Sequence, residues 1–180
     1  MPSTRRKRTS TPSCRRSRKR WPPDARGSHE YAADRKSIGF PVHRVPRVTW
    51  RASDVLALRT GVCYAKAHAL AALLRAESIP AALCYQRLAA DDGTDPVLHG
   101  LVALRLPGRK TWHRQDPRGN KAGIDAQFSM DGERLAWTVR EECNELDYPV
   151  LFDAPHPAVL SVLKAAVDRT HLWRTLPTSL

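Results

Sequence analysis

A predicted helix that begins on a cysteine is the feature that most constrains this chain. Residues 60–77 are dominated by strong helix formers. Thr60 is a candidate cap for the first free amides and Gly61 permits a tight turn, so we expect the helix to begin within a residue or two of Cys63. Apolar residues recur at helical spacing and predict one face that packs into a core, with Cys63 at its tip. This face comprises Cys63, Ala67, Leu70, Ala71, Leu73 and Leu74.

The position of Cys63 favours thiol chemistry. The positive end of a helix dipole and its unpaired amides stabilise an anion, which biases a thiol toward thiolate, the form that attacks carbonyl carbons. The same amides are suited to hold an oxyanion. Taken alone, a cysteine at the end of an apolar stripe is more often a small buried hydrophobe. The functional interpretation therefore depends on a histidine and a carboxylate later in the chain.

The strong positive charge of the chain is confined to its beginning. The net charge is +12, but residues 1–47 hold 14 Lys and Arg against three acids, while residues 48–180 hold 16 against 15. We expect residues 1–37 to form a basic, disordered leader, because they bury too little apolar surface to offset the entropy of ordering. Residues 38–180 are expected to form one folded domain. Non-specific attraction of the leader to nucleic-acid phosphates is expected as an accessory property, weakening with salt.

The remaining composition is typical of a cytoplasmic protein without a membrane span. No apolar stretch is long enough to cross a bilayer, and the start lacks the apolar segment of a secretory signal. The cysteines, Cys14, Cys63, Cys84 and Cys143, lack the short paired spacing of a zinc site, and we expect reduced thiols and no metal or cofactor. Cys84 lies in a predicted strand over residues 81–88 and is expected to be packed.

A predicted hairpin brings one histidine to one aspartate. Residues 98–106 and 111–116 are expected to form antiparallel strands around a turn at 107–110. In an antiparallel hairpin, the residue numbers of directly opposed residues have a constant sum. A two-residue loop gives a sum of 215 and places His99 directly opposite Asp116. A four-residue loop gives a sum of 217 and places the two residues diagonally. Side chains alternate with period two, so either register puts both residues on one face.

Two other histidines are poorly placed to act on Cys63. His113 differs from Asp116 by an odd step and points to the other face of the hairpin. His68 lies about 140° around the helix from Cys63. His99 is therefore the histidine that a neighbouring carboxylate can orient.

The region after the hairpin is less regular. We expect Arg118 to be a surface cation or to form a salt bridge to Asp116, and Phe128 and Trp137 to be core anchors. An apolar rhythm predicts a helix over residues 159–167. An exposed acidic face is expected from Glu141, Glu142, Glu145 and Asp147.

Several of these motifs, in this order, resemble the transglutaminase-like superfamily, and more narrowly its bacterial and archaeal cysteine-protease-like members. The resemblance covers roughly residues 48–155. It is carried by Cys63 within residues 60–66, the helix and Ile79-Pro80-Ala81 that follow, the strand 84–88, His99-Gly100, and residues 112–120. The fold that it implies is papain-like α+β, with a cysteine-bearing helix packed on an antiparallel sheet that carries histidine and aspartate.

The resemblance also implies an activity. Cys63 would be the nucleophile, His99 the base and later the acid, and Asp116 the group that orients the imidazole. The implied reaction is thiol-dependent hydrolysis or acyl transfer on the amides of a peptide or protein substrate. The Cys63 amide is the expected oxyanion donor, and Gln86 and Trp112 are candidates for a second. The alternative is a transglutaminase-like module that binds peptides or proteins without turnover.

Overall fold

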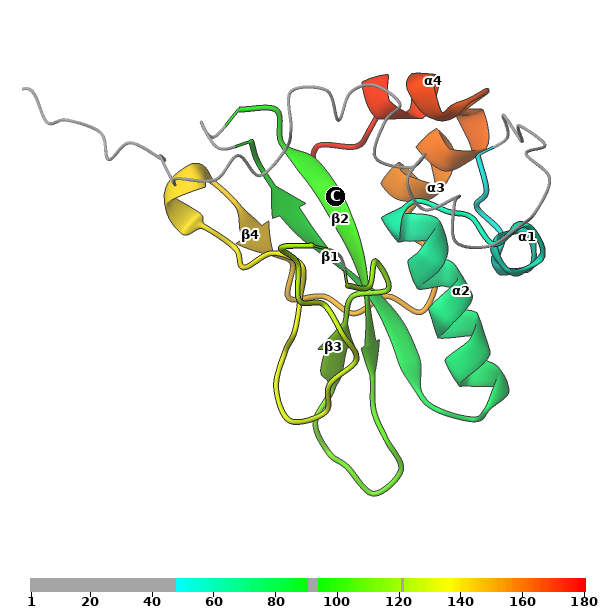
Figure 1. The fold of residues 1–180 in the computed structure, drawn as a ribbon, viewed down its shortest axis with the longest axis vertical. Helices are drawn as coiled ribbons and strands as arrows, with labels where there is room; N and C mark the ends of the chain where they lie inside the picture. The colour runs from blue at the N-terminus through cyan, green and yellow to red at the C-terminus, as the bar shows by residue number, and fades with distance from the viewer. Residues whose placement is uncertain (1–47, 91–93, 121) are drawn as a thin grey trace, which may run out of the picture.

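The computed structural model describes residues 48–90, 94–120 and 122–180, so the predicted basic leader lies outside the described residues. Four strands form one antiparallel sheet in the order β3-β2-β1-β4 (Figure 1). The strands are β1 (Ala81–Leu88), β2 (Val97–Leu104), β3 (His113–Gln115) and β4 (Leu146–Asp147). With the helices described next, this sheet confirms the predicted α+β class.

Helices precede and follow the sheet along the chain. The first two are α1 (Ala52–Leu58) and α2 (Cys63–Ala76), and the last two are α3 (Pro157–Ala165) and α4 (Arg169–Arg174). A 3-10 turn, η2 (Glu141–Cys143), precedes β4. Figure 1 shows α2 lying beside β1 and β2, with α3 and α4 near the start of α2. None of the helices in the described residues is long and apolar enough to cross a membrane.

The two central strands are buried along almost their whole length because both of their faces are covered. Leu83, Tyr85 and Val102 join the main core together with the helices. Cys84 and Leu101 belong to a smaller cluster with Ala103 and Leu135. In a strand covered on both faces, apolar and polar residues do not alternate. This explains why the sequences of β1 and β2 are almost continuously apolar.

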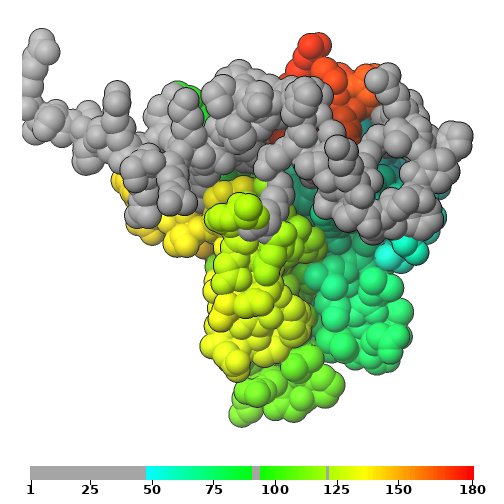
Figure 2. All heavy atoms as spheres, viewed as in Figure 1, coloured from blue at the N-terminus to red at the C-terminus, as the bar shows by residue number. Residues whose placement is uncertain are grey.

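The β2–β3 hairpin adopts one of the two predicted registers. The pairs Val102–Gln115 and Leu104–His113 each have an index sum of 217. β2 ends earlier and β3 begins later than expected, so the connection spans residues 105–112. Figure 2 shows this loop projecting from the molecule beside α2.

The start of α2 corrects one prediction. Thr60 does not cap the helix, because the N-cap position is Val62 and no side chain caps it. The Thr60 hydroxyl instead accepts a hydrogen bond from Arg169 Nη2 at 2.6 Å, and the Thr60 carbonyl accepts one from the Thr49 hydroxyl at 2.9 Å. Thr60 thereby ties α4 to the segment that enters α2, and the first amides of α2 receive no side-chain cap.

Two expectations for the irregular region are also wrong. Phe128 is 64% exposed rather than a core anchor, whereas Trp137 is buried. Glu145 is not part of an exposed acidic face, because it is buried in a salt bridge with Arg140 at 2.8 Å and accepts the Ala89 amide at 3.0 Å. A buried carboxylate requires such partners, and here Arg140 comes from the same segment and Ala89 from a distant one.

Candidate active site

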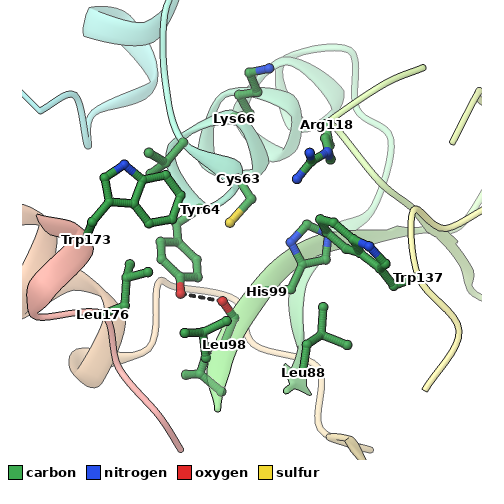
Figure 3. Close-up of a pocket in the computed structure, with 12 residues that line it drawn as sticks. Cys63, Tyr64, Lys66, Leu88, Leu98, His99, Arg118, Trp137, Trp173 and Leu176 are labelled. Atoms are coloured by element: carbon green, nitrogen blue, oxygen red, sulfur yellow. Dashed lines mark hydrogen bonds between the residues drawn. The ribbon is translucent and has the colours of Figure 1, made fainter. Parts of the chain in front are cut away.

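A close approach between α2 and β2 sets the position of Cys63. Gly100 lies directly against Tyr64: a Cβ added at Gly100 would lie 2.9 Å from Tyr64 Cδ1 and 3.1 Å from Tyr64 Cα. The Tyr64 hydroxyl donates a hydrogen bond to the Leu98 carbonyl (Figure 3). These contacts hold the first turn of α2 on β2, and they bring Cys63 beside His99, the neighbour of Gly100.

His99 and Asp116 form a buried hydrogen-bonded pair. His99 Nε2 lies 2.8 Å from Asp116 Oδ2, and the two residues are only 3% and 5% exposed. The carboxylate also accepts the Arg118 amide at 2.9 Å and the Ala136 amide at 3.1 Å. Because backbone groups fix Asp116, it holds the imidazole in one orientation, with Nε2 toward the carboxylate and Nδ1 left for the thiol.

The electrostatics of the three groups favour a thiolate–imidazolium pair. Burial alone raises the pKa of Cys63, but the hydrogen bond and charge of His99, together with the Gly100 amide, outweigh burial and lower that pKa below its ordinary value. Burial lowers the pKa of His99, but its hydrogen bonds to Asp116 and Cys63 raise that pKa to about 9. Burial opposes ionisation of Asp116 as well, yet the hydrogen bond to His99 holds its pKa below the ordinary value.

A small cavity opens on Cys63. Its volume is about 40 Å³, enough for the few atoms of a reacting carbonyl group. Trp137 packs edge-on against His99, with ring centroids 4.9 Å apart and planes at 86°. Figure 3 shows the Cys63 sulfur between His99 on one side and Trp173 and Leu176 on the other. These apolar walls limit the access of water to the thiol.

The second oxyanion candidates do not reach this cavity. Gln86 pairs with His99 across β1 and β2, but it is buried and absent from the lining of the cavity. Trp112 lies in the β2–β3 loop, where it is 39% exposed and stacks with Arg105. The structure therefore brings together Cys63, His99 and Asp116 and leaves Gln86 and Trp112 outside.

The other histidines lie away from the thiol. His68 Nδ1 is 2.9 Å from the Trp50 carbonyl, and His113 Nε2 is 3.1 Å from the Thr111 hydroxyl. Neither residue lines the cavity beside Cys63.

The other described cysteines differ from Cys63. Cys84 is a free, buried thiol, and burial raises its pKa to about 12. Cys143, at the end of η2, is buried. Within the described residues, no group of three or more His, Cys, Asp or Glu side chains is arranged to hold a metal ion.

Several contributors to the site were not predicted from sequence. The Gly100 amide supports the thiolate, the Ala136 amide supports Asp116, and Trp137 contacts His99. Arg118 reaches Asp116 through its backbone N–H, and not through the salt bridge that was one of its two expected roles. Backbone amides cannot be recognised from residue types, and Trp137 comes from a segment without periodicity. The glycine that directly follows His99 is the one sequence signal for the close contact between this part of β2 and α2.

Comparison with protein-family models finds a match. The model described as transglutaminase-like superfamily matches residues 25–117, just over half of the chain, and this range contains Cys63, His99 and Asp116. The match begins inside the segment predicted to be a leader. Comparisons with curated proteins and with solved structures find no match.

Proposed function

Because the chain belongs to the transglutaminase-like superfamily, we propose that Cys63, His99 and Asp116 form the catalytic site of a cysteine enzyme. The proposed reaction is acyl transfer from the amide of a peptide or protein. The observation that carries the proposal is the hydrogen-bonded series of the Cys63 thiol, the His99 imidazole and the Asp116 carboxylate. In this series the effect of His99 on the Cys63 pKa contributes to a net lowering, although burial acts to raise that pKa. A thiol needs such an adjacent imidazole to act as a strong nucleophile at neutral pH.

The first half of the reaction forms a thioester. The Cys63 thiolate attacks the carbonyl carbon, a C–S bond forms, and the carbonyl electrons move to oxygen. The C–N bond then breaks as imidazolium His99 gives its Nδ1 proton to the leaving nitrogen, which departs as ammonia or an amine. Asp116 keeps Nε2–H hydrogen-bonded throughout and stabilises the imidazolium.

The developing oxyanion requires donors near the thiol. The backbone N–H of Cys63 is the proposed donor, because it lies at the first position of α2 and no side chain caps this helix. Removal of one such donor in other enzymes costs about 3 to 4 kcal/mol of transition-state stabilisation. Gln86 and Trp112 are not assigned this role, because neither lines the cavity.

The second half of the reaction decides the activity. The nucleophile is water or a neutral amine. His99, now neutral, takes a proton from this nucleophile as the nucleophile attacks the thioester, and the C–S bond breaks to regenerate the thiolate. Water gives a protease or amidase, and a lysine amine gives a crosslinking transferase. A module that only binds peptides has no need for a thiolate, so the lowered pKa of Cys63 favours the enzyme.

The test uses an acyl donor that requires no knowledge of the natural substrate. We expect p-nitrophenyl acetate to release a rapid burst of one p-nitrophenolate per chain with acetylation at Cys63, and we expect Cys63→Ala to lose the burst. Adding a primary amine then separates the two activities, because a transferase yields the acetylated amine and a hydrolase yields acetate. Acetylation of Cys63 no faster than that of a free cysteine peptide would overturn the proposal.

Replacing Asp116 with asparagine is expected to lower the pKa of His99. That pKa is raised to about 9 in part by the hydrogen bond to Asp116, so loss of the carboxylate lets the imidazolium lose its proton at lower pH. An NMR titration of the His99 imidazole measures this shift. Asp125→Asn is the matched control, because Asp125 is exposed and pairs with Arg134. An unchanged His99 titration in Asp116→Asn would contradict the assigned role of the carboxylate.

A further inference from the structure

Two cations lie at the cavity beside Cys63. Lys66, one turn along α2 from the thiol, and Arg118, two residues after Asp116, both line it. Among the described residues that line the cavity, none is an aspartate or a glutamate. Apart from these cations, Cys63 and His99, the lining is aromatic or aliphatic. The electrostatic character of this small opening is therefore positive.

Arg118 is held in place over the site. Its guanidinium carbon lies 4.4 Å from the centroid of the Trp137 ring, and Trp137 in turn packs against His99. Figure 3 shows the guanidinium on the Cys63 side of Trp137, while the Lys66 amine points away from the sulfur. The stacking already restricts the Arg118 side chain, so this side chain loses less conformational entropy when it binds a ligand.

The guanidinium has unused hydrogen-bonding capacity. Arg118 Nε is buried and has no hydrogen-bond partner in the part of the chain that the structure describes. The backbone N–H of Arg118, and not its side chain, supports Asp116. Arg118 is also absent from the groups that set the pKa of Cys63, which are burial, His99, the Gly100 amide and Asp116. The side chain is therefore free to serve a ligand and not the thiolate.

We propose that Arg118 is a specificity residue that binds a carboxylate next to the reacting carbonyl, so that the preferred acyl donors are anionic peptides. This inference rests on the proposed function of Cys63. A planar guanidinium binds carboxylate through two parallel hydrogen bonds, and this pairing is strengthened where apolar walls limit water. The carboxylate is either the end of a peptide chain or an acidic side chain beside the scissile amide.

The test compares three alkylating probes at Cys63, none of which requires turnover. Iodoacetyl-glycine has a terminal carboxylate, the α-amide of iodoacetyl-aspartate has a side-chain carboxylate, and iodoacetyl-glycinamide is neutral. Each rate is measured by mass spectrometry at Cys63 and divided by the rate with glutathione. We expect at least one anionic probe to react faster than the neutral probe, and the faster of the two identifies the source of the carboxylate.

Two variants with the same change in net charge distinguish a local effect of Arg118 from an effect of the overall charge of the protein. In Arg118→Gln we expect the anionic preference to fall about three- to fivefold, the effect of removing one partly exposed charge pair. Arg109→Gln, an exposed change of the same charge, should keep the preference. Arg118→Lys keeps the charge but loses the planar two-bond pairing, so it should keep only part of the preference. Equal preferences in Arg118→Gln and Arg109→Gln, or no preference in the native chain, would overturn the proposal.

The probes also distinguish this inference from the proposed function. The absolute rate at Cys63 and its loss in His99→Ala report on the activation of the thiol. The ratio of anionic to neutral probes reports on Arg118, and it is measurable at raised pH even with an ordinary thiol. An unactivated Cys63 that still prefers anionic probes would overturn the proposed enzyme activity and support the carboxylate subsite. An activated Cys63 without this preference would support the activity and overturn the subsite.

Discussion

Replacing His99 with alanine is expected to slow the acylation of Cys63 by p-nitrophenyl acetate at neutral pH by about 10²- to 10⁴-fold, the range that a positioned acid–base group supplies. The reason is electrostatic. Burial disfavours the Cys63 thiolate, and the hydrogen bond and charge of His99 are the main groups that reverse this effect. Without His99 the effect of burial on the Cys63 pKa remains, so the thiolate population falls. Stopped-flow measurement of the p-nitrophenolate burst gives the rate directly.

A matched histidine variant makes this result specific. His113→Ala removes an imidazole that contacts Thr111 in the β2–β3 hairpin and lies outside the cavity, so its burst should match that of the native chain. Equal losses in the two variants would indicate a general effect on folding. A native rate in His99→Ala would remove the imidazole from the mechanism.

Introducing valine at Gly100 is expected to destabilise the fold and to move Cys63 away from His99. The added Cβ would lie 2.9 Å from Tyr64 Cδ1 and 3.1 Å from Tyr64 Cα, which is backbone and cannot rotate away. Overpacking of this kind costs about 1–3 kcal/mol of unfolding free energy. A displacement of the thiol by about 1 Å lowers the rate of acylation by about 10²-fold, even in molecules that remain folded.

Two measurements separate these effects of Gly100→Val. Urea unfolding gives the change in stability, and the p-nitrophenolate burst at low temperature, where the variant is folded, gives the change in rate. Gly132→Val is the control, because a Cβ there would meet no atom within 4 Å. A folded Gly100→Val with native reactivity would contradict the account of how α2 is positioned.

Local sequence patterns predicted the parts of the fold that depend on short-range chemistry. The strand expected over residues 81–88 corresponds to β1 (Ala81–Leu88), and the helix expected at Cys63 corresponds to α2 (Cys63–Ala76). Two hairpin registers are compatible with the sequence, and the one with an index sum of 217 is observed. The loop is longer than either alternative, so the register depends on which faces of β2 and β3 are buried and not on the turn alone.

The features that could not be predicted arise from contacts between distant segments. The Thr60 hydroxyl is bound by Arg169, so it is not available to cap α2. Glu145 is buried where it accepts the Ala89 amide, which comes from the end of β1. No periodicity or motif in one segment reveals the partner supplied by another. The same is true of Trp137, which reaches His99 from a region without regular secondary structure.

The most direct test of the central claim is the rate of Cys63 alkylation by iodoacetamide as a function of pH, in the native chain and in His99→Ala. The ordinary thiol pKa is 9.0, and that of native Cys63 lies below it because the gain from His99 and the Gly100 amide exceeds the effect of burial. We therefore expect native Cys63 to remain reactive as the pH falls below 9.0, whereas His99→Ala should react only as the pH rises to that value or above. Superimposable profiles, both rising as for an ordinary thiol, would contradict the account.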